Sequence, residues 1–158
     1  MFSVGDKIAH PMHGAGIIKG VTTQRIDGEN RDYFEVEMVA GTMTVMIPCG
    51  NNSVAGIRPI IIPDMVNEVL AKLLEEQEAD DFNWNKRYRE NMIKIKSGDL
   101  IQVAGVIKAL VLRERERGLS TGERKMLTSA KQIVVSEIAL AKDISYKEAE
   151  NIVNERLI

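Results

Sequence analysis

The chain has 158 residues, which is enough for one medium-sized domain or two small ones. Its 21 basic and 23 acidic side chains leave a net charge of −2, which excludes a uniformly basic nucleic-acid coat and an acidic solvating tail. Hydrophobic residues make up 44% and charged residues 28%, a composition typical of a folded chain. The single cysteine excludes a disulfide framework and a multi-thiolate metal site. The apolar stretches are too short for a membrane span and no signal-peptide pattern is visible, so we expect a cytoplasmic protein.

Residues 1–62 are predicted to form a small β domain. Strands are expected at Lys7–His10, from Gly14, at Tyr33–Val39 and, after a turn at 41–42, at Met43–Ile47. The pair Asp27-Gly28 is typical of a hairpin turn. The alternation of apolar and acidic residues over Tyr33–Val39 indicates a half-buried strand. Short strands at such close spacing favour a small, strongly bent sheet or barrel.

Residues 63–158 are predicted to form an all-α domain of about five helices, because the apolar period changes from two to 3.6 at Pro63. Helices are expected over Met65–Gln77, Asn83–Ile95, Leu100–Arg117, Ser120–Ala141 and Ser145–Leu157. Ser120 and Glu123 form the S-x-x-E pattern of a capping box, and Ser145 and Glu148 repeat it. The fold is therefore predicted to be α+β with two domains.

Charge is polarised along the second half of the chain. Residues 64–85 carry a net charge of −6, residues 86–131 carry +7 and residues 132–158 carry −2. A localised positive field of this kind orients a protein on an anionic partner. The alternative is that the run Arg113–Arg117 is only a solvated helix face with internal ion pairs. Both interpretations stay open at the level of the sequence.

Trp84 is the only tryptophan and stands at the junction between the acidic and basic regions. Its helical spacing with Tyr88 and Met92 favours a place in the core. A tryptophan at a helix N-terminus can also stack on a base or wedge beside it while neighbouring cations hold phosphates. Spacing alone does not decide between these two interpretations.

No catalytic or metal-binding arrangement stands out. His10 and His13 have no carboxylate or thiol nearby in the sequence, so metal binding is not predicted. The pattern Gly14-x-Gly16 lacks the rest of any phosphate-binding fingerprint, and Cys49 has no evident base beside it. We therefore predict no catalytic residue, no metal and no cofactor, and we do not expect an enzyme.

Motifs spread over nearly the whole chain occur together, and in the same order, in a known family. They are the segments Val4–Lys7, Pro11–Gly16, Thr44–Pro48, Asn83–Tyr88, Arg117–Leu127, Ala130–Ile133 and Glu137–Ala141. In these segments the chain resembles the CarD/CdnL family of bacterial transcription regulators.

The resemblance implies an N-terminal Tudor-like (SH3-like) β barrel that binds the β subunit of RNA polymerase. It also implies a helical domain that contacts promoter DNA at the upstream edge, or fork, of the transcription bubble. There the family's tryptophan, which corresponds to Trp84, wedges into the distorted minor groove so that the open complex persists. The resemblance thus favours a DNA-facing Trp84 over one in the core. It implies a non-enzymatic regulator that acts as a monomer on polymerase, without a membrane partner.

The resemblance also implies two sets of site residues. Those expected to contact DNA are Trp84, Asn85, Lys86, Arg87, Arg89, Lys94, Arg117, Arg124 and Lys125. Those expected to face RNA polymerase are Gln24, Arg25, Ile26, Thr44, Val45 and Met46. Some relatives carry arginine at the positions of Gln24 and Met46. This chain does not, although Arg25 is adjacent.

Two other hypotheses belong to different classes of protein. In the first, the chain is a polymerase-bound adaptor whose basic helices contact a second protein rather than DNA. In the second, it is a sequence-specific repressor that binds duplex DNA tightly without polymerase. The net charge of −2 disfavours the second hypothesis.

Overall fold

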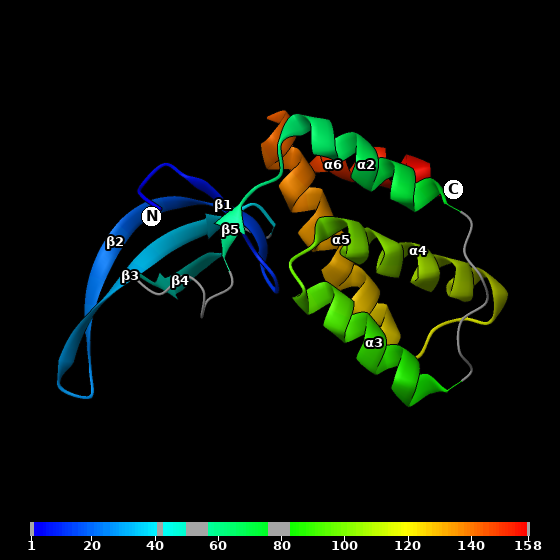
Figure 1. Ribbon diagram of the computed structural model, residues 1–158, viewed down its shortest axis with the longest axis horizontal. Coiled ribbons are helices and arrows are strands. Elements are labelled where there is room, and N and C mark those ends of the chain that lie inside the picture. Colours follow the sequence, from blue (N-terminus) through cyan, green and yellow to red (C-terminus); the bar gives the residue numbers. More distant parts are fainter. Residues whose placement is uncertain (1, 41–42, 50–56, 76–82, 158) are drawn as a thin grey trace.

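The computed structural model of the chain describes residues 2–40, 43–49, 57–75 and 83–157. Its strands are β1 (Lys7–His10), β2 (Gly14–Ile26), β3 (Glu29–Met38), β4 (Thr44–Pro48) and β5 (Arg58–Pro59). Its helices are α2 (Pro63–Leu74), α3 (Trp84–Lys96), α4 (Leu100–Glu116), α5 (Thr121–Lys142) and α6 (Tyr146–Arg156). An antiparallel sheet thus precedes a group of helices, which confirms the α+β prediction (Figure 1). The turn at 41–42 and the helix end expected at Gln77 lie outside the described residues.

The sheet is antiparallel with the strand order β4-β3-β2-β1-β5, so β4 and β5 are its edge strands among the described residues. The long β2–β3 hairpin turns at Asp27 and Gly28, whose φ angles of 53° and 79° are both positive, as a type I′ turn requires. The expected strand over Tyr33–Val39 begins four residues earlier, at Glu29, because the polar residues after the turn continue the pairing with β2. A bulge between Ile18 and Gly20 interrupts the register and increases the local bend.

One face of the sheet carries the first hydrophobic core. Its buried residues are Ile8, Ile18, Phe34, Val36, Met38, Ile47 and Ile57. They alternate along β3 with exposed or half-buried residues such as Glu35 and Glu37, as the period of two predicts. The sheet therefore has an apolar inner face and a polar outer face.

The helices begin and end at residues that the sequence patterns indicate. Pro63 occupies the first turn of α2. The hydroxyls of Ser120 and Ser145 accept the Glu123 and Glu148 N–H groups, as expected for the two capping boxes. Gly118, with a φ of 79°, follows α4 and donates its N–H to the carbonyls near the helix end. The helices bury a second core that includes Val69, Val103, Ile107, Leu110, Ala130, Val134 and Ile138.

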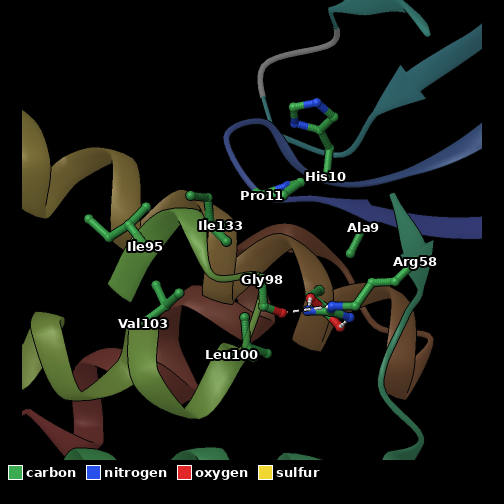
Figure 2. Close-up of a pocket in the computed structure, with 10 residues that line it drawn as sticks. Ala9, His10, Pro11, Arg58, Ile95, Gly98, Leu100, Val103 and Ile133 are labelled. Carbon is green, nitrogen blue, oxygen red and sulfur yellow. Dashed lines mark hydrogen bonds and ion pairs between the residues drawn. The ribbon is translucent and has the colours of Figure 1, made fainter. Parts of the chain in front are cut away.

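Helix α5 is the element that joins the helices to the sheet. Gly14 of β2 has a φ of 81°, and a Cβ there would lie 2.5 Å from the Ser136 Oγ, so only glycine fits between strand and helix. The next residue, Ala15, donates its N–H to the same Oγ at 2.9 Å. Figure 2 shows a cavity that is lined by residues of both halves, among them Ala9 and Arg58 of the sheet and Ile133 of α5; its volume is about 10 Å³. A cavity of this size holds about one water molecule.

The domain boundary proposed at residues 62 and 63 falls between β5 and α2. The packing of Gly14 against Ser136 crosses that boundary, as does a hydrogen bond from the Lys7 Nζ to the Leu140 carbonyl at 3.3 Å. The two halves are therefore distinct in architecture and in contact with each other.

Candidate nucleic-acid interface

Trp84 is the first residue of α3 and is 42% exposed. Its indole stacks on the ring of Tyr88, with ring centroids 5.0 Å apart and an interplanar angle of 20°. Gly122, in the first turn of α5, lies against both rings: a Cβ there would be 3.8 Å from Trp84 Cζ2 and 3.7 Å from Tyr88 Cε2. The indole is therefore supported by Tyr88 and Gly122 while much of the residue stays open to solvent.

The residues that follow Trp84 at helical spacing do form the inner face of α3, but Trp84 itself is not buried. Ile95 is buried, while Tyr88 and Met92 are half-buried and pack against the core of the helices. Trp84 lies at the N-terminal end of this face, where α3 has no preceding turn to cover it. The interpretation that places Trp84 in the core is therefore wrong.

Ser120 holds the indole by its nitrogen. The Trp84 Nε1–H donates to the Ser120 Oγ at 3.1 Å. The same oxygen accepts the Glu123 N–H at 3.2 Å and lies 3.2 Å from the Glu123 Oε1, to which the hydroxyl donates. A serine hydroxyl has two lone pairs and one hydrogen, so this geometry uses all of its hydrogen-bonding capacity.

Glu123 connects Ser120 to a buried arginine. Glu123 is 2% exposed, and its carboxylate accepts hydrogen bonds from Arg87 Nε at 3.0 Å and Nη2 at 3.2 Å. The Arg113 Nε lies 3.9 Å from the same carboxylate. Burial raises the pKa of Glu123, but the hydrogen bond and charge of Arg87, together with the bonds from Ser120, outweigh it. The pKa of Glu123 is therefore lower than its ordinary value.

Arg87 corrects one prediction about the DNA-contacting set. Its side chain is 4% exposed and its guanidinium pairs with Glu123 inside the protein. The sequence pattern could not separate it from Arg89, because both stand in the same basic segment. A phosphate cannot reach a guanidinium that is buried in this way, so Arg87 is a structural residue.

The other residues of the predicted DNA-contacting set are exposed. They are Asn85, Lys86, Arg89, Lys94, Arg117, Arg124 and Lys125. Lys86 lies 4.0 Å from Glu90, and Arg124 lies 3.9 Å from Glu114. Exposed ion pairs of this length are weak, so these cations can exchange a carboxylate for a phosphate. Whether they do so stays a prediction.

The run Arg113–Arg117 is not only a solvated face with internal pairs. Arg113 lies beside Glu123, Glu114 beside Arg124, and Arg115 donates to the Leu157 carbonyl. These contacts reach α5 and the C-terminal end of the chain. Part of the +7 region therefore holds the helices together, and the rest is surface charge.

The residues predicted to face polymerase occupy two strands of the sheet. Thr44 and Met46 lie exposed on the edge strand β4, and Val45 packs against the core of the sheet. The Gln24 Nε2 lies 3.5 Å from the Met46 Sδ, so these two residues meet on one face. Arg25 points to the opposite face, because side chains alternate along a strand. Arg25 therefore cannot replace an arginine at position 24 on that face.

Sequence reasoning missed Ser120, Glu123, Tyr88 and Gly122 as part of the site. The pattern at Ser120 and Glu123 was visible, but it indicated only the start of a helix. Ser120 is 36 residues from Trp84 in the chain, and nothing in the spacing shows that the two side chains meet.

Within the residues that the structure describes, no group of three or more His, Cys, Asp or Glu side chains is placed to hold a metal ion. None of the described helices is both long and apolar enough to cross a membrane.

These features define a two-domain protein in which a small antiparallel sheet is joined to a helical half with one exposed tryptophan. Residues 2–61 match the CarD-like/TRCF RID domain, and residues 68–154 match the CarD C-terminal domain. A Bacillus subtilis (strain 168) protein named "Putative transcription factor YdeB" is 33% identical over 152 residues, covering 96% of this chain and 99% of that protein. The chain therefore belongs to the CarD family of transcription factors, which confirms the resemblance. Its role is in transcription regulation, and its N-terminal domain is Tudor-like.

Proposed function

We propose that this protein binds the β subunit of RNA polymerase through its sheet and stabilises the promoter open complex through its helices. The helical half would contact DNA at the upstream edge of the transcription bubble, with the protein acting as a monomer on polymerase in the cytoplasm. The observation that carries the proposal is the 42% exposure of Trp84 at the N-terminal end of α3. The match of residues 2–61 to the RID domain supports the interaction with polymerase.

The sheet offers a surface for polymerase through its edge. The outer side of β4 is unpaired among the described strands, so a strand of the partner can add to it through backbone hydrogen bonds. Thr44 and Met46 alternate with Val45 along this edge and would supply the side-chain part of the contact. Gln24 would add a neutral amide where some relatives place a charge.

The helical half contributes an aromatic surface and a modest positive charge. Stacking of one aromatic side chain on a base contributes about 1–3 kcal/mol, which corresponds to a change of about 5- to 150-fold in an open–closed equilibrium. A change of that size regulates initiation without chemistry.

Polymerase would compensate for weak binding of the helices to free DNA. The +7 region is flanked by regions of −6 and −2, and Arg87 is already neutralised by Glu123. Affinity for an isolated duplex is expected to be low. Docking on polymerase holds the helices near the bubble and replaces a bimolecular encounter by a high effective concentration.

Two measurements test the proposal in sequence. Binding to RNA polymerase core is measured first, with a β-subunit N-terminal fragment as competitor. Saturable binding that the fragment abolishes is the expected result, and no binding at micromolar concentration contradicts the proposal.

The lifetime of the promoter open complex is then measured with Trp84→Ala. The variant is expected to keep its affinity for polymerase and to shorten the lifetime. Ile93→Ala is the matched control, because Ile93 is 65% exposed on the same helix and lies outside the predicted site. An unchanged lifetime with Trp84→Ala would instead favour the adaptor hypothesis.

A further inference from the structure

We propose that Ser120 is the positioning residue for Trp84: its hydroxyl holds the indole N–H against the N-terminal end of α5, so that Trp84 meets DNA through its rings and not through a hydrogen bond. This inference rests on the proposed function, since it concerns how the same tryptophan acts. The hydrogen bond of 3.1 Å between Trp84 Nε1 and Ser120 Oγ carries it.

The indole has one polar group, and the structure already uses it. Tryptophan is a donor only, through Nε1–H, and that donor is directed at Ser120. What Trp84 exposes is therefore carbon surface. Carbon surface responds to stacking and to the ease of opening a base step rather than to the donor and acceptor pattern of the base edges. The contact would depend little on which base is present.

The position of Ser120 is itself determined by buried groups. The Oγ accepts the Glu123 N–H and donates to the Glu123 carboxylate, which Arg87 holds from the other side. A chain of hydrogen bonds from Arg87 through Glu123 and Ser120 to Trp84 thus connects the core of the helices with the exposed ring. Tyr88 supports the ring from the side, so the orientation of Trp84 exists before DNA arrives. A preorganised side chain loses less conformational freedom on binding.

The chain contains a matched control for Ser120. Ser145 begins α6 with the same capping box: its Oγ accepts the Glu148 N–H and donates to the Glu148 carboxylate, both at 3.1 Å. Ser145 holds no tryptophan. Glycine is tolerated at the N-cap position of a helix almost as well as serine. Ser120→Gly therefore removes the acceptor for the indole with little loss of helix capping. Ser145→Gly makes the same change elsewhere.

The first measurement uses the fluorescence of Trp84, the only tryptophan of the chain. Ser120→Gly is expected to lower its steady-state anisotropy and to increase its quenching by acrylamide. Ser145→Gly is expected to leave both unchanged, and Ser120→Thr, which keeps the hydroxyl, to restore them. Equal anisotropy and quenching in Ser120→Gly and the parent protein would overturn the positioning role.

The second measurement is the lifetime of the promoter open complex. Ser120→Gly is expected to shorten it by about 2- to 12-fold, the effect of one hydrogen bond, with unchanged affinity for polymerase. Replacement of Trp84 by its benzothienyl analogue, in which sulfur takes the place of the N–H, is expected to shorten it equally. The two changes together are expected to do no more than either alone, because they remove the same bond.

The outcomes separate this inference from the proposed function. If Ser120→Gly keeps the full lifetime while the benzothienyl analogue shortens it, the N–H bonds to DNA and the inference is wrong. If Trp84→Ala shortens the lifetime but Ser120→Gly and the analogue do not, Trp84 acts without help from Ser120 and the inference is again wrong. If Trp84→Ala itself has no effect, the proposed function fails first.

Discussion

Arg58 of β5 and Glu137 of α5 form a bidentate ion pair across the seam between the sheet and the helices. The Nη1–Oε2 and Nη2–Oε1 distances are 2.6 Å and 2.8 Å. Glu137 also accepts the Ile61 N–H at 2.8 Å, and the Arg58 Nε donates to the Gly98 carbonyl at 2.8 Å. Figure 2 shows the Arg58 side chain extending from its strand toward Gly98. This ion pair thus connects helix α5 with strand β5 of the sheet, with the segment before α2 and with the segment before α4.

The two partners of this pair are not equally buried, which predicts unequal effects of mutation. The side chain of Glu137 is fully buried, whereas that of Arg58 is 30% exposed. Arg58→Met leaves an uncompensated buried carboxylate and is expected to lower the free energy of unfolding by about 3–5 kcal/mol. Glu137→Gln leaves a cation that still reaches water and is expected to cost about 1–3 kcal/mol. Urea denaturation of both variants gives the comparison, and the reverse order would contradict it.

A second prediction concerns Gly14, where backbone conformation and packing both require glycine. Gly14→Ala places a Cβ 2.5 Å from the Ser136 Oγ at a φ of 81°. Gly28 provides the control, because its φ is 79° but no atom lies within 4 Å of its Cβ position. Gly28→Ala is expected to cost about 1 kcal/mol from backbone strain alone, and Gly14→Ala clearly more. Equal denaturation midpoints for the two variants would show that the strand and α5 separate easily.

Arg87 and Arg89, two residues apart in α3, are expected to respond in opposite ways to substitution. Arg87→Met leaves the Glu123 carboxylate buried without its main partner, and a loss of about 3–5 kcal/mol in the free energy of unfolding is expected. Arg89 is exposed, so Arg89→Met is expected to change stability by less than about 0.5 kcal/mol. Under the proposed function, Arg89→Met shortens the open-complex lifetime. Denaturation and lifetime measurements on both variants test this separation, and a stable Arg87→Met would argue against it.

The lowered pKa of Glu123 predicts a loss of stability in acid. In the unfolded chain a glutamate titrates near pH 4.3, and in the folded protein the pKa of Glu123 is lower. Between the folded and the unfolded pKa value, the unfolded state binds the proton more readily than the folded state does. The stability that the Glu123 carboxylate contributes is therefore present above this pH interval and is lost as the pH falls through it. Glu123→Gln lacks this dependence. The difference in free energy of unfolding between the parent protein and the variant is therefore expected to shrink from pH 7 to pH 3.5, and a constant difference would contradict the assignment.

The sequence is informative where local chemistry determines structure. The turn at Asp27 and Gly28 and the capping boxes at Ser120 and Ser145 follow from side chains that act within four residues, and each is found where it is expected. For Trp84, which the sequence singled out but could not place, the family resemblance favoured the exposed position that the structure shows. The sequence is silent where distant segments meet. Neither the burial of Arg87 against Glu123 nor the bond between Trp84 and Ser120 leaves a trace in spacing, because each joins residues 36 positions apart.

The N-terminal end of α5 supports Trp84, and the C-terminal half of the same helix packs against β2 through Ser136. From Ser120 to Ser136 the helix rises about 24 Å at 1.5 Å per residue, a length equal to about seven base pairs of duplex at 3.4 Å each. Under the proposed function, α5 then fixes the distance between the sheet and the indole of Trp84. Polymerase would set the position of the sheet, and the number of helical turns, rather than the length of a flexible linker, would select the base step that the indole reaches.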